Sequence, residues 1–195
     1  MRRRTLDFVF SAGGLGVAVL LLILGLVMTS NANFAKSYVR DQLREQHITF
    51  KPASSLTAEE KKAPCIVKYA GQALSTGKQA ECYANEFIGL HLKSIAGGKT
   101  YAQLGDVQTD LKAKIAAAQK ANDPAAVADL QKQLTDVTAQ RETVFKGETL
   151  RGLLLYAWGW SVVATIAIYS SWAAFAGALI VLAAIVYSLV RPEHS

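Results

Sequence analysis

Residues 8–30 read FVFSAGGLGVAVLLLILGLVMTS, and residues 152–190 read GLLLYAWGWSVVATIAIYSSWAAFAGALIVLAAIVYSLV. Neither stretch contains an Asp, Glu, Lys or Arg. About 20 apolar residues, each adding 1.5 Å of helix, suffice to cross the hydrocarbon core of a bilayer. Inside lipid the backbone groups must bond to one another, so both stretches are predicted to hold membrane-spanning helices. We therefore expect an all-α membrane protein whose two transmembrane helices flank an extracytoplasmic helical domain with an antiparallel coiled-coil hairpin.

The basic residues at the N-terminus predict the orientation of these helices. Arg2, Arg3 and Arg4 precede the first stretch, and Arg191 follows the second. By the positive-inside rule both short ends, residues 1–7 and 191–195, lie in the cytoplasm. Residues 31–151 are then extracytoplasmic, and we expect the chain in the plasma (inner) membrane, in contact with membrane lipid.

The net charge of +6 does not indicate nucleic-acid binding. The middle segment mixes basic and acidic residues along its whole length, as an ordinary solvated surface does. A nucleic-acid site instead concentrates its Lys and Arg on one face or in one run. We expect no nucleic-acid partner.

A cleaved signal peptide is the competing interpretation of the first stretch. Ser30-Asn31-Ala32 loosely fits the small-residue cleavage rule, but the apolar run of about 23 residues is longer than the usual 7–15. The glycines also suit a retained helix that packs against other helices in the membrane. We predict a retained transmembrane helix at 8–30, with Gly13 and Gly16 as packing residues.

Cys65 and Cys82 are the only cysteines of the chain. Both lie in the segment assigned to the outside, where an oxidising compartment favours a disulfide. The alternative is a pair of free thiols, either buried as small apolar groups or reactive in a redox enzyme. No CxxC, HxxxH or HExxH spacing accompanies them, so no metal site is predicted.

Helical patterns dominate residues 31–105, the predicted extracytoplasmic domain. Residues 33–46 continue the first helix, residues 47–50 form a short extended piece, and Thr57 with Glu60 has the form of a capping box. Residues 79–96 form an amphipathic helix that stops at Gly97-Gly98. His91 lies on its apolar face, where we expect a buried, hydrogen-bonded core residue.

A helical hairpin is predicted for residues 106–146. Its first arm carries a narrow apolar stripe. After a break at Asp123-Pro124, where Asp123 is an N-cap, the apolar residues recur at 3-4-3 spacing, the seam of a coiled coil. The stripes include Leu111, Ile115, Val127, Leu130, Leu134 and Val137. The hairpin is either a local pair that buries its own stripe or an arm that docks a partner, and the sequence leaves both open.

The second apolar stretch is too long for one perpendicular span. Tyr156, Trp158 and Trp160 lie in its first part, and aromatic residues of this kind collect at the membrane–water interface. We predict an apolar interfacial helix at 147–169 and the second transmembrane helix at 170–190. A helix that is apolar all round must be buried, so these three residues are predicted to pack on a partner.

Two segments resemble a known group of proteins: AECYANEFIGLHLKSIAGGKTYAQLGD at 80–106 and VFKGETLRGLLLYAWGW at 144–160. Both are similar to actinobacterial two-span membrane proteins, some labelled aromatic ring-opening dioxygenases. That chemistry needs iron ligands, and His47, His91 and His194 form no facial triad. The size and layout also resemble small accessory subunits of the actinobacterial cytochrome bcc–aa3 respiratory supercomplex. The hairpin lies between the matching segments like an insertion.

No catalytic or cofactor-binding motif appears in the sequence: no Walker loop, GxSxG, haem CxxCH or Rossmann glycine pattern. We expect no enzyme and no cofactor. The leading interpretation is a non-enzymatic accessory or assembly subunit of a larger complex of integral membrane protein subunits, with the respiratory supercomplex first. Alternatives are a subunit of an envelope lipid-transport assembly and an extracytoplasmic ligand-binding sensor.

Overall fold

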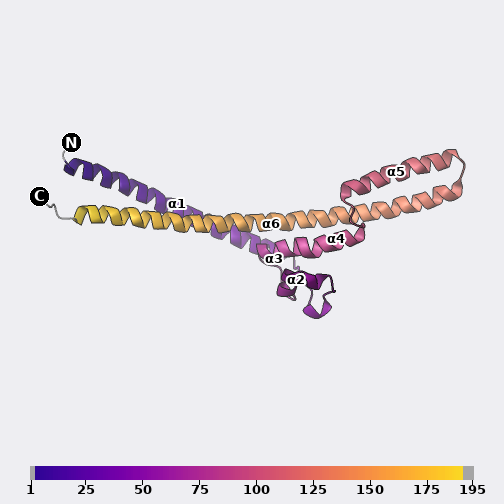
Figure 1. Ribbon diagram of the computed structural model, residues 1–195, viewed down its shortest axis with the longest axis horizontal. Coiled ribbons are helices and arrows are strands. Elements are labelled where there is room, and N and C mark those ends of the chain that lie inside the picture. Colours follow the sequence, from indigo (N-terminus) through magenta and orange to yellow (C-terminus); the bar gives the residue numbers. More distant parts are fainter. Residues whose placement is uncertain (1–2, 191–195) are drawn as a thin grey trace. The chain divides into compact units, whose positions relative to one another are not determined.

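The computed structural model describes the backbone of residues 3–190 and the side chains of residues 7–190 (Figure 1). The arginine side chains used for the orientation argument, and residues 191–195, lie outside that part. The described chain is almost entirely helical: α1 Arg3–Glu45, η1 Ala53–Ser55, η2 Glu60–Lys62, α2 Pro64–Tyr69, α3 Gly77–Cys82, the π-helix η3 Tyr83–Ile88, α4 Gly89–Ile95, α5 Tyr101–Lys120 and α6 Pro124–Val190. Within residues 3–190, extended pairing is limited to an antiparallel bridge between Thr49 and Ala73.

The chain divides into two compact units. Unit 1 takes α1 up to Gln42 and α6 from Gly159 onward, and unit 2 is Leu43–Trp158. The helices α1 and α6 therefore each contribute to both units. Each contains a segment long and apolar enough to cross a membrane, by length and composition.

In unit 1, α1 and α6 pack in antiparallel directions. Ideal Cβ atoms built on Gly14 and Gly25 of α1 meet Ile185 and Phe175 of α6, and one built on Gly177 of α6 meets Leu21. As the α1 number rises from 14 to 25, the α6 number falls from 185 to 175. Small buried residues line both sides of this contact: Ala18, Ala32, Ala164, Ser171, Ala174 and Ala178. Small side chains let two helix backbones approach closely.

Unit 2 has its own apolar core under the short helices. Phe50, Ile66 and Leu74 are almost wholly buried, and the bridge at Thr49–Ala73 holds the extended segments beside them. The α6 residues of this unit pack against α4, where a Cβ on Gly147 would lie 2.5 Å from Leu92 Cδ2. They also pack against α5, whose Leu104 and Leu111 are buried.

Several sequence predictions for unit 2 are confirmed. Thr57 and Glu60 exchange the two hydrogen bonds of a capping box, although the helix that follows is the short 3₁₀ turn η2. Asp123 accepts a hydrogen bond from the Ala126 N–H, and α6 begins at Pro124. Gly97 and Gly98 both have positive φ, of 58° and 79°, immediately after α4 ends. Glycine adopts such angles at no steric cost because it has no Cβ.

Two features differ from the sequence-based expectation. The hairpin arm, the apolar segment and the second span were expected as separate elements, yet α6 has no boundary at residue 147 or 170. Single glycines such as Gly147 and Gly152 cost about 1 kcal/mol each against alanine, which is too little to end a helix. The expected helix at 79–96 is continuous but changes to a π-helix over Tyr83–Ile88.

Gly25→Ala is expected to destabilise unit 1 because the added Cβ would lie 2.6 Å from Phe175 Cε1. Forcing one carbon into a packed contact costs about 1–3 kcal/mol. Thermal unfolding in a mild detergent measures the loss. Gly16→Ala is the matched control, since no described atom of α6 lies within 4 Å of its Cβ position. The double change Gly25→Ala with Phe175→Leu should recover much of the stability, and equal effects of both alanines would refute this packing.

Candidate functional site

The two glycines predicted to pack on a partner, Gly13 and Gly16, face away from α6. A Cβ on either meets no described atom within 4 Å apart from its chain neighbours and the nearby backbone of α1, and both residues are exposed. The neighbouring Gly14 instead faces α6, because a Cβ built on it would lie 3.1 Å from Ile185 Cδ1. Sequence alone did not separate these roles, which depend on the rotation of α1 about its axis. Gly13 and Gly16 therefore leave two positions without side chains on the face of α1 that is turned away from α6, and we call this pair of positions the Gly13–Gly16 notch.

Unit 1 has an exposed apolar surface at the end where α1 approaches Gln42 and α6 leaves Gly159. On α1, the rings of Phe34 and Tyr38 stack with centroids 5.9 Å apart, and both are more than half exposed. On α6, the exposed apolar residues of the same segment are Trp160, Val162, Val163, Ile166, Tyr169 and Trp172. We call this set, with Phe34 and Tyr38, the outer apolar surface.

The other two predicted aromatic residues, Tyr156 and Trp158, belong to unit 2 and differ in environment. Tyr156 is exposed, whereas Trp158 is half-buried with the Lys78 ammonium 5.8 Å from its ring centroid. The Trp158 Nε1–H is buried without a hydrogen-bond partner among the described residues. Trp158 thus packs within unit 2, whereas Tyr156 is more than half exposed.

Cys65 and Cys82 form the predicted disulfide, which joins α2 to the last residue of α3. The bridge closes a loop of 17 residues in sequence separation. In the chain-entropy treatment a loop of about that length stabilises the folded chain by roughly 3 kcal/mol. Both cysteines of the chain are therefore in the bond, and its formation points to an oxidising compartment for unit 2.

Glu60, the first residue of η2, carries a fully buried carboxylate. The Lys51 ammonium donates to its Oε1 at 2.8 Å, and the Thr57 backbone N–H donates to its Oε2 at 2.8 Å. His91 Nε2 lies 3.6 Å from the same Oε1. Buried charges need such partners, and this cluster connects three separate segments of unit 2.

The pKa of the Glu60 carboxyl is lowered from its ordinary value of 4.5. The hydrogen bond from Lys51 is the largest cause, followed by the bond from the Thr57 backbone, and both favour the charged form. Burial acts in the opposite direction and only partly offsets them. The charged carboxylate is therefore a structural element of unit 2.

The expectation for His91 is confirmed in part. Its Nδ1 lies 2.6 Å from the Phe87 backbone oxygen, so the ring is hydrogen-bonded as expected. Its side chain is 44% exposed, however, so it is not a buried core residue. The π-helical segment before α4 shifts the helix face relative to a regular 3.6-residue period, and the sequence pattern did not reveal that shift.

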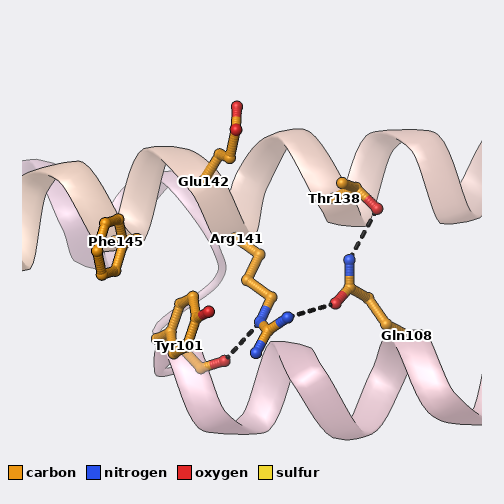
Figure 2. A pocket seen from close by; sticks show the side chains of 6 residues that line it. All are labelled: Tyr101, Gln108, Thr138, Arg141, Glu142 and Phe145. Carbon is orange, nitrogen blue, oxygen red and sulfur yellow. Dashed lines mark hydrogen bonds between the residues drawn. The ribbon is translucent and has the colours of Figure 1, made fainter.

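A groove lies between α5 and the facing part of α6 (Figure 2). Its volume is about 260 Å³, and its lining residues are Tyr101, Gln108, Thr138, Arg141, Glu142 and Phe145. Arg141 crosses the space between the helices, while Glu142 points away from it (Figure 2). We call this the Arg141 groove. None of its residues was predicted as a site residue, although Arg141 and Phe145 are one helical turn apart, which was a detectable signal.

The predicted hairpin residues lie along the same two helices. Leu111 and Ile115 of α5 are buried, and Val127, Leu130, Leu134 and Val137 of α6 are half-buried. Four side-chain contacts relate the helices: Gln108 with Thr138, Gln108 with Arg141, Tyr101 with Arg141, and Tyr101 with Phe145. The α6 number falls as the α5 number rises, so the helices run in opposite directions.

The described residues offer binding surfaces more clearly than reactive groups. Among residues 7–190, no group of three or more His, Cys, Asp or Glu side chains is placed to hold a metal ion. The outer apolar surface, the Gly13–Gly16 notch and the Arg141 groove are all open to a partner molecule. We therefore take these three surfaces as the candidate functional sites.

Glu60→Gln is expected to lower the stability of unit 2 at pH 7 and to flatten its acid dependence. A carboxyl with a depressed folded-state pKa contributes stability above its ordinary pKa of 4.5, and this is lost as the pH falls through the lower folded value. Urea unfolding between pH 7 and pH 3 measures this. Glu59→Gln is the control, because that exposed carboxylate pairs only with the exposed Lys62 among the described residues. Parallel profiles for wild type and Glu60→Gln would disprove the role.

No protein-family model, curated protein or solved structure matches this chain significantly. The function is therefore inferred from the surfaces just described.

Proposed function

We propose that the chain is a non-enzymatic accessory or assembly subunit that packs against other integral membrane proteins of a larger complex. Two helices, residues 8–30 and 170–190, would cross the plasma membrane, with residues 31–151 on the extracytoplasmic side. The register between α1 and α6 is the observation that carries this proposal.

The register supports a definite position for the membrane. Antiparallel helices advance by the same rise per residue, so the contacts Gly14–Ile185 and Gly25–Phe175 put Ser30 level with about Tyr169. Phe8 is then level with about Val190 by the same reasoning. The two spans proposed from sequence thus begin and end at matching depths. Tyr169 and Trp172, both exposed, would lie at the interface where such rings collect.

The same register supports a limit on how far along α6 the membrane extends toward its N-terminal end. Lys36 is the first charged residue of α1 after the apolar stretch, and the register puts it level with about Val163. Lipid that extended further along α6 would have to accommodate Lys36, which is costly. Residues 152–163 of α6, about 18 Å of helix, would therefore stand outside the hydrocarbon.

Part of that outer segment of α6 carries exposed apolar side chains. Val162 and Val163 are exposed, as are Phe34 and Tyr38 at a similar level on α1. A contiguous exposed apolar patch on a water-facing surface is typical of a protein-interaction site. We infer that the part of the outer apolar surface formed by Phe34, Tyr38, Val162 and Val163 contacts a partner subunit just outside the membrane.

The Gly13–Gly16 notch supports a second contact at the level of the bilayer. Association of helices in lipid depends on close van der Waals packing, which small residues permit. Since these glycines are not used against α6, they remain open to a partner helix. One partner could cover both the notch and the outer apolar surface only if it also crosses the membrane.

The extracytoplasmic placement of unit 2 is supported by the Cys65–Cys82 disulfide, since such bonds persist in oxidising compartments. We further propose that α5 and the facing part of α6 form an antiparallel coiled-coil hairpin. The 3-4 spacing of their apolar stripes supports this.

The cytochrome bcc–aa3 respiratory supercomplex is the first candidate for the complex, supported by the resemblance of the chain's size and layout to small accessory subunits of that complex. An envelope lipid-transport assembly is the alternative, and an extracytoplasmic sensor is the third candidate. The bonded cysteines make a dithiol redox role a weaker proposal than any of these.

Affinity purification of a tagged chain from its native membrane in mild detergent tests the proposal. We expect integral membrane subunits to co-purify in fixed stoichiometry. The double change Gly13→Leu with Gly16→Leu should release them while the thermal stability of the chain is kept, because these positions are open.

Ala176→Leu is the matched control for that experiment, since it also enlarges an exposed small residue, on α6. It should leave the partners bound. Recovery of the chain alone in every mild detergent, or retention of all partners by the double variant, would count against the proposed role.

A further inference from the structure

We infer that the Arg141 groove binds a helical segment of a partner protein that carries a carboxylate and an apolar side chain one turn apart. The groove lies wholly within unit 2. This inference goes beyond the proposed packing of the membrane spans and does not depend on it.

Arg141 has donors to spare and no carboxylate partner among the described residues. Its Nε–H donates to the Tyr101 backbone oxygen at 3.3 Å, and its Nη1 donates to Gln108 Oε1 at 2.9 Å. Both acceptors are neutral, and a guanidinium has five N–H donors. The adjacent carboxylate, Glu142, points away from the groove and lies 3.7 Å from Lys146 Nζ (Figure 2).

The guanidinium is held in place before any ligand arrives. It stacks over the Tyr101 ring, with Cζ 4.0 Å from the ring centroid. Thr138 accepts a hydrogen bond of 2.7 Å from Gln108 Nε2, which fixes the amide so that its oxygen faces Arg141. A positioned guanidinium loses little side-chain freedom on binding a carboxylate, and it favours that group over a neutral acceptor.

An exposed aromatic surface adjoins this charge. Tyr101 is 41% exposed and Phe145 is 56% exposed, and their ring centroids are 5.6 Å apart. Phe145 follows Arg141 by one helical turn on α6, so the charged and the apolar parts of the groove are side by side.

These two parts define the chemistry of the occupant. A carboxylate for Arg141 and an apolar side chain for Phe145 must be presented about one turn apart, which is the i, i+4 spacing of a helix. An amphipathic helix that lays its apolar face into a groove is a recurring mode of protein recognition. Charge complementarity with the uncompensated Arg141 requires that helix to be acidic at the point of contact.

Site-specific photocrosslinking in the full-length chain tests the inference. p-Benzoylphenylalanine replaces Phe145 in cells that naturally produce the protein, and the crosslinked partner peptide is mapped by mass spectrometry. We expect a partner segment with an Asp or Glu within one turn of the crosslink. The same probe at Ala139, an exposed residue on the other side of α6 from Arg141, is the control and should give no such product.

Two variants separate recognition from structure. Arg141→Glu should reduce the crosslink about tenfold or more, because a charge-assisted hydrogen bond is replaced by repulsion. Exchange of the mapped partner carboxylate for Arg should restore it. Gln108→Glu should also weaken the crosslink, since it supplies Arg141 with a carboxylate inside the groove. Its thermal stability is measured as well, because the change also removes the Nε2–H donor to Thr138, and a retained melting temperature shows that loss of folding does not explain the result.

Four outcomes would overturn the inference. These are the absence of any crosslink at Phe145, a crosslink to lipid, a crosslink to a second copy of this chain, and a protein crosslink whose yield does not respond to either variant. A responsive crosslink to an acidic helical segment, restored by the charge exchange, supports it. Failure of the co-purification test with the Gly13 and Gly16 variants would leave this result unaffected.

Discussion

The close approach of α1 and α6 at Gly25 and Phe175 is the contact on which the account of this protein depends. With any larger side chain at residue 25, the ring of Phe175 could not keep its position. Small buried residues continue the same seam along both helices: Ala18 and Ala32 on α1, and Ser171, Ala174 and Ala178 on α6. Because these side chains are small, the two backbones lie close and the register has little freedom to slip.

That register locates the membrane span on α6, which the sequence of α6 alone does not do. The 39 residues from Gly152 to Val190 are free of charge, so hydropathy alone allows many positions for a membrane span. On α1 the charge-free stretch is bounded by Asp7 and Lys36. Because α1 and α6 are paired, the same limits apply to the α6 residues level with Asp7 and Lys36. The apolar residues of α6 before about Val163 then lie outside the proposed membrane. The partner inferred to cover part of the outer apolar surface follows from this position of the membrane.

Much of the fold was predictable because its signals are local. The two apolar stretches, the stop at Gly97-Gly98, the Asp123-Pro124 helix start and the Cys65–Cys82 bond each depend on a few neighbouring residues or on composition. The continuity of α6 was not predicted, because changes of polarity near residues 147 and 170 looked like element boundaries although no residue there breaks a helix. The capping boxes at Thr76 and Thr100 were present in the sequence but were overlooked.

The candidate sites were less predictable because they depend on contacts between distant residues. Gly13 and Gly14 are adjacent and chemically identical, yet only the packing against α6 separates the open position from the filled one. Arg141 meets Tyr101 and Gln108 across a gap of at least 33 residues, which no local pattern encodes. The buried charge of Glu60 likewise depends on Lys51, which lies in another segment, nine residues away.

Spin labels along α6 measure where the membrane begins and ends on this helix. Spin labels on single introduced cysteines at Leu153, Val163, Ile166, Trp172, Leu179 and Val186, with the native disulfide intact, report collisions with oxygen and with a water-soluble nickel complex in lipid nanodiscs. The account predicts oxygen-dominated collisions at Leu179 and Val186, nickel-dominated collisions at Leu153 and Val163, and a crossover near Tyr169. Labels at Leu20 and Phe34 on α1 should match those at Leu179 and Ile166. An oxygen-dominated environment that continues to Leu153 would contradict the account.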